Sequence, residues 1–314
     1  MDVRPEAVTL AWDEPGWLDE ATAWIDGHVT RTGDVEVVLA RAWSAVARVP
    51  TTEGEAWFKE DPPTLAFEPA LTAALSRLRP DLLPEVIAFD GPRLLTRDAG
   101  RRLRTQLDEG APAPSWEQLL ARFAQLQLDL APASEEAIAL GTLDARPEVI
   151  EQLSAALPGH PRRTAVVQRA VGGLGRMIPP TVVHTEAHDG NLFIRDGQVR
   201  LLDWAEAVVS HPFVGTVLPL RFAAERIGAA PGSPGVERLR DAYLEPFTPF
   251  APPATLRSAF EDGYLLGTLV RALSWDTVLA RHDRAVAAEL GDPVPAWLEI
   301  FDGVEAGTIT LGDA

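Results

Sequence analysis

The first third of the chain mixes helical and extended spacings of apolar residues. Apolar positions three and four residues apart predict helices over 17–29 and 69–78. Short runs of β-branched and aromatic residues, separated by turn-forming residues, predict an antiparallel sheet of about five strands. The predicted strands cover residues 35–39, 45–49, 55–58, 85–89 and 93–96.

The rest of the chain, from about residue 101, has mainly helical spacing. The predicted helices cover residues 116–130, 149–157, 164–177, 235–244, 254–264 and 265–281. Residues 181–204 interrupt them with a loop and two strands. The pattern therefore predicts an α+β chain, in which a small sheet-rich lobe of residues 1–97 precedes a mainly helical lobe of residues 98–314.

Composition narrows the class of protein. Hydrophobic residues make up 46% and charged residues 24% of the 314 residues, as in a folded globular protein. No apolar run approaches the ~18–20 residues of a membrane span, and the N-terminus lacks a secretory pattern, so we expect a cytoplasmic protein without a membrane partner. The absence of cysteine excludes disulfides, thiolate metal sites and a cysteine nucleophile.

The charge balance is strongly acidic. The 28 basic and 46 acidic residues give a net charge of -18, which disfavours a nucleic-acid partner. This charge suits a cationic substrate, but a solvated acidic surface is the more common cause of such a balance. Nothing in the pattern indicates an oligomeric state. Two residue types occur once only, because Lys59 is the single lysine and Asn191 the single asparagine.

The segment from His184 to Trp204 carries the clearest chemistry. Two apolar runs flank Asp196-Gly197, which is the strongest short signal for a β-hairpin. Such a hairpin brings Asn191 and Asp203 beside each other at its open end. An amide oxygen and a carboxylate suit a hard cation such as Mg²⁺, whereas a surface hairpin with a polar end needs no ligand at all.

This segment resembles the aminoglycoside phosphotransferase-like kinases, a family with the protein-kinase fold. Their catalytic loop reads His-Gly-Asp-x-His-x-x-Asn, and an Asp-Trp or Asp-x-Gly motif follows about a dozen residues later. His184, His188, Asn191 and Asp203 match these positions with the family spacing. The resemblance implies a two-lobed protein-kinase-like fold, with a small antiparallel-sheet N-lobe and a mainly helical C-lobe. It also implies that Asn191 and Asp203 hold the Mg²⁺ ions of bound ATP, or of GTP as an alternative.

The single lysine fits this chemistry. A kinase needs a cation on a strand of the small lobe for the nucleotide phosphates, together with a helix carboxylate that orients it. Lys59 ends the third predicted strand, and Glu68 begins the next helix. Since Pro69 confines Glu68 to the first turn, Glu60 and Asp61 are alternative partners.

Two further segments match nucleotide-binding positions of the family. Residues 94–100 match the hinge, so the resemblance implies adenine contacts at Thr96, Arg97 and Asp98. No Gly-x-Gly-x-x-Gly precedes Lys59, and the first turn, Ala42-Trp43-Ser44, places Ser44 as a phosphate contact.

One position departs from the family. Glu186 stands where the family has the aspartate that accepts the proton of the substrate hydroxyl. The extra methylene moves the carboxylate by more than about 1 Å, and misplacement on that scale can cost on the order of 10²-fold in rate. We therefore predict Glu186 as the catalytic base, either in a re-adapted site or in a slow enzyme. Glu206 is predicted to be structural.

Four alternatives or open questions accompany this prediction. His184 and His188 have the spacing of a zinc pair, although zincins place the glutamate directly after the first histidine, and the histidines otherwise brace the loop. A protein kinase acting on a short peptide is disfavoured because only residues 204–210 separate Asp203 from the next helix. A pseudokinase-like nucleotide-binding module remains open because of Glu186.

The prediction is an ATP-dependent kinase of a small hydroxyl-bearing molecule. The sequence does not assign Glu261, Asp262 and Asp276 to its acceptor site.

Overall fold

The computed structural model describes residues 11–281 and 291–313, and these divide into two compact units. Among the described residues, unit 1 consists of 11–100, 194–205, 277–281 and 291–292. Unit 2 consists of 101–193, 206–276 and 293–313. The segment 194–205 thus joins unit 1, although it follows almost a hundred residues of unit 2.

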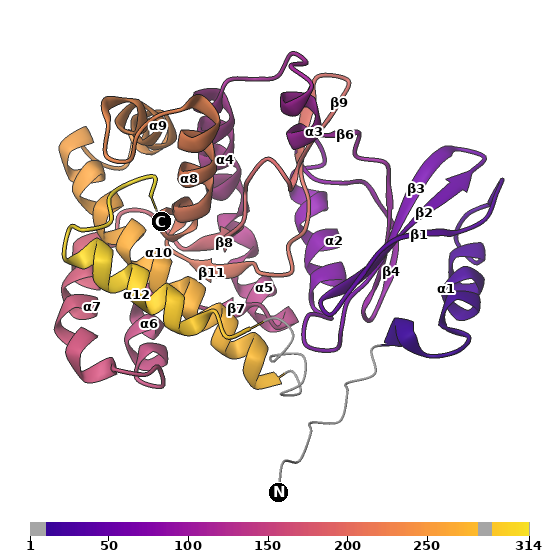
Figure 1. The fold of residues 1–314 in the computed structure, drawn as a ribbon, viewed down its shortest axis with the longest axis horizontal. Coiled ribbons are helices and arrows are strands. Elements are labelled where there is room, and N and C mark those ends of the chain that lie inside the picture. The colour runs from indigo at the N-terminus through magenta and orange to yellow at the C-terminus, as the bar shows by residue number, and fades with distance from the viewer. Residues whose placement is uncertain (1–10, 282–290, 314) are drawn as a thin grey trace, which may run out of the picture. The chain divides into compact units, whose positions relative to one another are not determined.

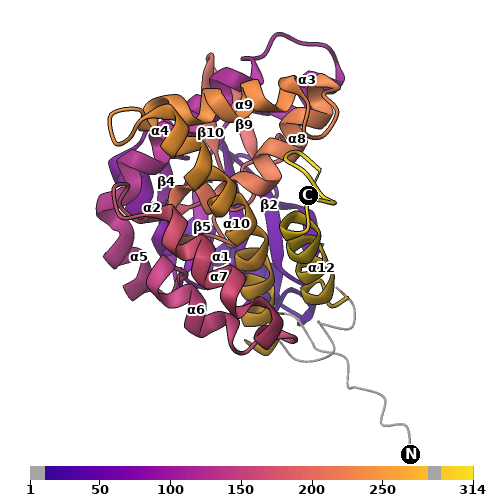
Figure 2. The ribbon, with the colours of Figure 1, turned by 90° about the vertical axis from the view of Figure 1, so that its left-hand side faces the viewer.

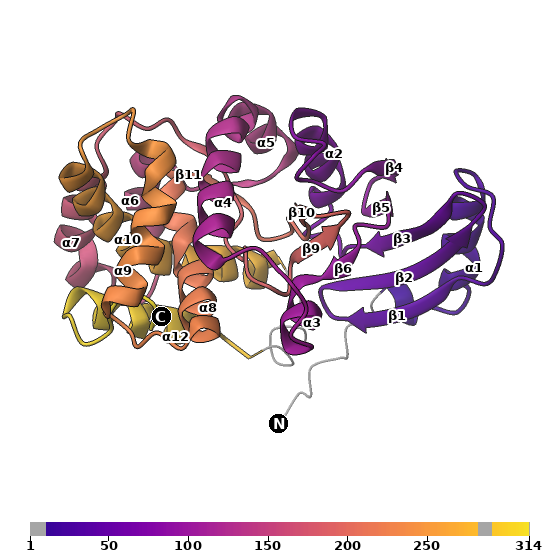
Figure 3. The ribbon, with the colours of Figure 1, turned by 90° about the horizontal axis from the view of Figure 1, so that it is seen from above.

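Unit 1 is built on an antiparallel five-stranded sheet with the order β1-β2-β3-β5-β4 (Figure 3). This confirms the predicted sheet, and the strand ends differ by one or two residues from the prediction. The strands are β1 (Glu36–Arg41), β2 (Ser44–Thr51), β3 (Gly54–Glu60), β4 (Val86–Asp90) and β5 (Arg93–Arg97).

Two helices pack on opposite faces of this sheet (Figure 1). From α1 (Trp17–Asp26), which follows the short helix η1 (Ala11–Asp13), Ile25 packs against Phe58 and the other buried residues of one face. Because side chains alternate along a strand, Lys59 points to the other face, where α2 (Glu68–Leu78) lies. Helix α1 ends earlier than predicted, since Gly27 caps it.

A hairpin of β9 (Leu192–Arg195) and β10 (Gln198–Leu201) reaches into unit 1. Asp196 has a φ of 53° and Gly197 a φ of 74°, and left-handed backbone at both central residues is what a type I′ turn requires. The predicted hairpin is therefore confirmed. The amide of Leu201 donates to the carbonyl of Leu82 and ties the hairpin to the rest of the unit.

Unit 2 is mainly helical and contains a small sheet with the order β7-β11-β8. The strands of that sheet are β7 (Leu143–Asp144), β8 (Thr181–Val183) and β11 (Val208–Ser210), and unit 2 also contains the short strand β6 (Arg101–Arg102). Its α-helices are α3 (Leu103–Asp108), α4 (Trp116–Leu130), α5 (Ser134–Leu140), α6 (Pro147–Ser154), α7 (His160–Leu174), α8 (Val217–Ile227), α9 (Pro234–Leu244), α12 (Val294–Glu305) and α10 (Pro253–Arg281), of which residues 277–281 are assigned to unit 1. The 3-10 helices are η2 (Ala131–Ala133), η3 (Pro212–Thr216) and η4 (Glu245–Phe247).

Helix α4 begins and ends where its amphipathic pattern predicts, and Ser115 and Gln118 form a capping box that fixes its start. Helix α10 differs from the prediction, which divided residues 254–281 into two helices. It runs unbroken through Gly263 and Gly267, where it packs closely on a neighbouring segment, and a Cβ at Gly263 would lie 2.4 Å from the Cβ of Phe213. Helix α10 lies alongside α7 and α12 (Figure 2). The prediction also missed α3, α5, α8 and α12.

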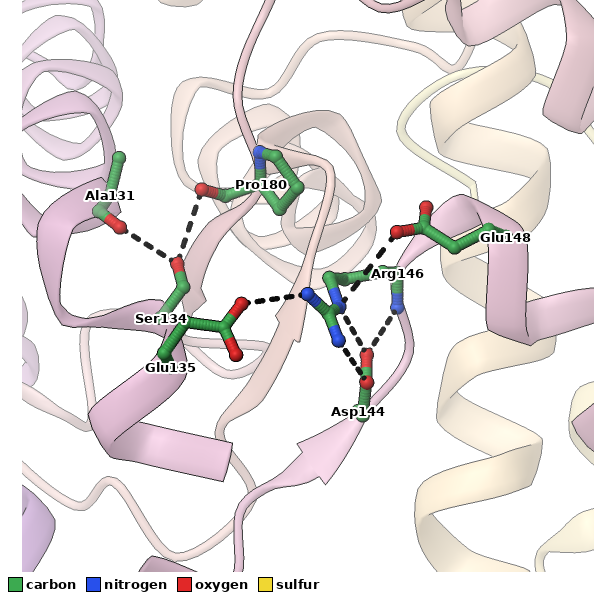
Figure 4. A network of polar contacts seen from close by, with 7 residues as sticks. All are labelled: Ala131, Ser134, Glu135, Asp144, Arg146, Glu148 and Pro180. Carbon is green, nitrogen blue, oxygen red and sulfur yellow. Dashed lines mark hydrogen bonds and ion pairs between the residues drawn. The ribbon is translucent and has the colours of Figure 1, made fainter. Parts of the chain in front are cut away.

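A polar network joins three elements of unit 2 around Arg146 (Figure 4). Its guanidinium donates to Asp144 at 2.9 and 2.7 Å and to Glu135 at 2.8 Å, and Glu148 lies 3.9 Å away. These partners belong to β7, α5 and the first turn of α6. The Arg146 network thus fixes a local corner of the fold. No helix within the described ranges has the length and apolar character needed to cross a membrane.

Candidate functional site

Lys59 lies on unit 1 among three carboxylates. Its ammonium group donates to Glu68, donates to Asp203 at 2.8 Å and lies 3.3 Å from Asp61. Burial alone would lower the pKa of Lys59, but Asp203, Asp61 and Glu68 outweigh it and raise this pKa well above its ordinary value. Lys59 therefore stays a cation at neutral pH. The predicted pairing with Glu68 is confirmed despite Pro69.

Glu68 links this lysine to the turn that carries Asp203. One carboxylate oxygen of Glu68 accepts from Lys59, and the other accepts from the backbone amide of Trp204 at 2.9 Å. Asp203 has a φ of 70°, an uncommon conformation for a residue other than glycine. The buried indole of Trp204 donates to the carbonyl of Leu201 at 3.3 Å. The turn is thus held on both sides, and the Asp203 side chain is 49% exposed.

The alternative partners of Lys59 have different surroundings. Asp61 is buried, and its burial followed by the nearby Glu68 raises the pKa of Asp61 well above its ordinary value. Glu60 points to the other face of the sheet and accepts from Trp17 at 3.1 Å and Arg93 at 3.0 Å. Asp61 therefore lies beside the ammonium group of Lys59, and Glu60 does not.

The other predicted nucleotide contacts lie on strands of the same sheet or directly after one. Ser44 starts β2, and Thr96 lies on β5; both are buried. Arg97 pairs with Glu53, and Asp98 accepts from Trp57 at 3.1 Å. The structure places all four residues in unit 1 with Lys59. Their contacts with a nucleotide remain predictions.

The predicted catalytic loop, residues 184–191, lies in unit 2 and is braced by its own histidines. His184 accepts from the amide of Glu186 at 3.1 Å, and His188 accepts from the amide of Gly190 at 3.0 Å, each through Nδ1. The His188 ring packs on Phe222 of α8, with 4.7 Å between ring centres. The side-chain nitrogen of Asn191 donates to the carbonyl of Glu186 at 3.1 Å. The histidines thus shape the loop, as predicted.

Glu186, the predicted base, forms an ion pair with Arg271 of α10. The Nη2 group of Arg271 donates to Glu186 Oε1 at 2.8 Å. Its Nη1 group donates to Glu206 at 2.6 Å and to the Thr185 hydroxyl at 3.0 Å. The guanidinium lies over the ring of Trp297, 5.3 Å from its centre. Glu206 is therefore a partner of Arg271, in line with its predicted structural role.

A second ion network, centred on Asp189, also holds this loop. Asp189 is fully buried and accepts from Arg104 of α3 at 2.9 Å and from Arg226 of α8 at 2.7 Å. Arg226 also pairs with Asp108 at 2.6 Å. Arginines from two helices thereby compensate a carboxylate that would be costly to bury alone.

The two predicted metal ligands belong to different units, Asn191 to unit 2 and Asp203 to unit 1. Their shared role in binding Mg²⁺ stays a prediction. Of the carboxylates that the sequence left unassigned, Glu261 is exposed, and Asp262 packs onto Gly173. Burial raises the pKa of Asp262. Within the described residues, neither Glu261 nor Asp262 forms a hydrogen bond or ion pair with Glu186.

Sequence reasoning missed Arg104, Arg226, Arg271 and Trp297. A signal existed for Arg271, which is the only charged residue in the stretch 263–275. A charged residue in such a stretch is rarely buried unless it is paired. The sequence gives no comparable indication of its partners.

The site residues found here are suited to phosphoryl transfer, in which positioned charges do most of the work. Unit 1 supplies a permanent cation beside an exposed carboxylate, and unit 2 supplies a carboxylate on a braced loop. These are the charges that a nucleotide phosphate, a metal ion and a hydroxyl group would each require.

Comparison with known proteins agrees with this picture. A family model described as "Phosphotransferase enzyme family" matches residues 10–214. No curated protein shows a significant match to the chain.

Solved structures resemble the fold over nearly the whole chain. The GDP and kanamycin complex of APH(2″)-IIia has 15% identity and a TM-score of 0.57, covering 92% of this chain and 99% of that one. A macrolide 2′-phosphotransferase type I has 15% identity and a TM-score of 0.54, covering 90% and 97%. An ethanolamine kinase of Plasmodium vivax has 9% identity and a TM-score of 0.56, covering 86% and 83%. These similarities confirm the predicted fold class.

Proposed function

Since the chain belongs to the phosphotransferase enzyme family and is thus a phosphotransferase acting on hydroxyl groups, we propose that it transfers the γ-phosphoryl group of Mg-ATP to a small polar molecule. The observation that carries the proposal is the Lys59 cluster. Its cation is held by Glu68, and Glu68 also fixes the turn that presents Asp203. This is the charge arrangement that a kinase requires for the nucleotide phosphates.

Lys59 would bind the α- and β-phosphates of the nucleotide. Thr96, Arg97 and Asp98 would contact the adenine, and Ser44 would contact the phosphates. GTP is the alternative donor. In this proposal the nucleotide-binding residues belong to the predicted lobe 1–97 and its junction at residue 98, and the base belongs to the lobe 98–314.

The donor atoms of Asp203 and Asn191 fit a magnesium ion. Asp203 offers a half-exposed carboxylate, and the amide nitrogen of Asn191 is engaged by the Glu186 carbonyl, which leaves the amide oxygen as the ligand atom. Carboxylate and amide oxygens are hard ligands of the kind that Mg²⁺ prefers. When bound, the ion would neutralise charge on the phosphate oxygens.

Glu186 would act as the general base. Arg271 bonds Oε1, and the Glu186 side chain is 25% exposed, so the carboxylate can be reached from solvent. The hydroxyl proton of the acceptor would pass to Glu186 as the hydroxyl oxygen bonds to the γ-phosphorus. The bond from that phosphorus to the bridging oxygen then breaks, and ADP leaves.

We expect the acceptor to be cationic or neutral rather than anionic. The net charge of -18 would attract a cation over a long range, and salt weakens such attraction. Turnover of a panel of hydroxylated amines and hydroxylated acids at low and high ionic strength tests this. A preference for anions, or a polycation whose turnover ignores salt, would contradict it.

A nucleotide-binding module with weak or no catalysis is the second candidate. The Glu186–Arg271 ion pair favours it, because one oxygen of this carboxylate already accepts a hydrogen bond from a buried guanidinium group. Both candidates share nucleotide binding and differ in whether any acceptor is phosphorylated.

Thermal unfolding with and without Mg-ATP tests the proposal. A ligand that binds the folded state raises Tm. At a ligand concentration a hundred times Kd, the free energy of unfolding increases by about 2.7 kcal/mol. Asp203→Ala should remove the part of the shift that depends on Mg²⁺, and Lys59→Ala should weaken the shift with nucleotide alone. Asp196→Asn is the matched control, since its side chain in the same hairpin is 91% exposed. A wild-type protein that ignores millimolar Mg-ATP would contradict both candidates.

A further inference from the structure

We propose that Arg271 is a positioning residue that holds the longer carboxylate of Glu186 in place, an inference that rests on the proposed role of Glu186 as the base. Arg271 reaches the loop from α10, and its Nη2 group lies 2.8 Å from Glu186 Oε1. It bonds the base and has no assigned contact with nucleotide or acceptor.

Arg271 is itself fixed by neighbours on several sides. Glu206 and Thr185 accept from Nη1 at 2.6 and 3.0 Å, and Trp297 of α12 lies against the guanidinium plane. The Thr185 hydroxyl in turn donates to the Glu206 carbonyl at 2.9 Å. These contacts leave the Nη2 group with a defined direction toward Glu186.

Burying the charge of Arg271 costs free energy unless carboxylates compensate it. The side chain is only 4% exposed and lies in the otherwise uncharged stretch 263–275 of α10. Well-packed apolar residues often serve stability as well as a buried ion pair does. What the arginine adds is a donor aimed at Glu186, with Glu206 balancing the remaining charge.

A glutamate base needs this support more than an aspartate does. The extra methylene adds a rotatable bond, so an unsupported carboxylate samples more positions. Misplacement by about 1 Å can cost on the order of 10²-fold in rate. Holding Oε1 restricts the side chain while Oε2 remains the oxygen that would accept the proton.

A double-mutant cycle in kcat tests this inference with the full-length protein. The four proteins are wild type, Arg271→Met, Glu186→Gln and the double variant, assayed on an acceptor from the panel above. We expect Arg271→Met to lower kcat about 10²-fold with little change in KM for ATP. In the Glu186→Gln background the same change should have little further effect, because there is no base left to position.

Two additional variants keep the test independent of folding. If Arg271→Met does not fold, Arg271→Lys carries the same cycle, since it retains the charge and loses the forked donor geometry. Arg146→Met is the matched control, because it removes an arginine with carboxylate partners elsewhere in unit 2, and it should leave kcat unchanged.

The outcomes separate this inference from the proposed function. Equal losses of kcat in both backgrounds, in a wild type that transfers phosphate, would overturn the positioning role alone. An unchanged kcat in the Arg271 variants would do the same. A wild type that binds Mg-ATP and phosphorylates nothing would overturn the proposed transfer, and the inference with it.

Discussion

Two arginines of unit 2 illustrate different uses of the same side chain. Arg146 is 25% exposed and bonds Asp144 and Glu135, which are two and eleven residues away in the sequence. Arg271 is 4% exposed and bonds Glu186 and Glu206, which are 85 and 65 residues away. Arg146 thus joins neighbouring elements, whereas Arg271 joins α10 to the loop of the proposed base.

The two arginines differ in how far water could hydrate their carboxylate partners if the arginine were removed. Around Arg146, Glu135 is 80% and Glu148 is 65% exposed, so losing the arginine leaves these two carboxylates to water, and Asp144 is as buried as the partners of Arg271. Around Arg271, the carboxylates are about three-quarters buried, and their common partner has little contact with solvent. The partners of Arg271 therefore depend on it for both charge compensation and position. Three predictions test this comparison, and a fourth concerns acid stability.

The largest effect is expected at the partners themselves. Glu186→Gln should lower kcat by about 10² to 10⁴, the usual contribution of acid–base catalysis, with nucleotide affinity nearly unchanged. Glu135→Gln, at a partner of Arg146, should leave kcat unchanged. Steady-state kinetics and calorimetry with Mg-ATP measure both quantities. Glu186→Asp then separates two explanations, since a slower variant indicates a site adapted to glutamate and a faster one a weakened base.

The next effect concerns stability. Arg271→Met should lower the free energy of unfolding by about 3 kcal/mol, because it leaves two largely buried carboxylates without their cation. Arg146→Met should lower it by about 1 kcal/mol or less. Chemical denaturation of the two variants measures the difference, and equal losses would remove the distinction drawn here.

A separate prediction concerns acid stability, which depends on a buried histidine and not on either arginine. His211 follows β11, and burial lowers the pKa of His211 to about 3. Its ring is therefore neutral in the folded protein, while the unfolded chain binds a proton as pH falls through about 6.5. Stability is thus complete above this pH and lost progressively as pH falls toward 3. From pH 7 to pH 5 the loss should be about 2 kcal/mol.

His211→Asn is the control for this acid effect. Asparagine can keep an acceptor near the position of Nδ1, which accepts from the Phe213 amide at 3.3 Å, and it does not titrate. The variant should be less stable at neutral pH and should lose less stability between pH 7 and pH 5. An unchanged pH dependence would show that other groups cause the acid effect.

The smallest effect is a dependence on salt. Raising the ionic strength from low salt to 1 M should reduce the cost of Arg146→Met by a few tenths of a kcal/mol, because exposed charges are screened. The cost of Arg271→Met should change less. Repeating the denaturation of both variants at the two salt concentrations gives the comparison.

Much of the fold and part of the site could be predicted from the sequence. The strands of unit 1 and helix α4 follow from the apolar spacing, and the Asp196-Gly197 turn follows from its backbone requirement. The pairing of Lys59 with Glu68 was also predictable, since both flank one short connection. Helices α3, α5, α8 and α12 were missed, and α10 was divided into two helices. The sequence does not indicate that the interior glycines of α10 lie at close contacts within one continuous helix.

The sequence by itself determined the elements, the loop motif and the identity of the charged residues, since periodicity and turn chemistry act between near neighbours. Only the tertiary structure decided that Arg271 meets Glu186, that Arg104 and Arg226 meet Asp189, and that residues 194–205 join unit 1. Such contacts form when helices pack against a distant loop. Their partners follow from the packing of whole elements, and no local pattern encodes it.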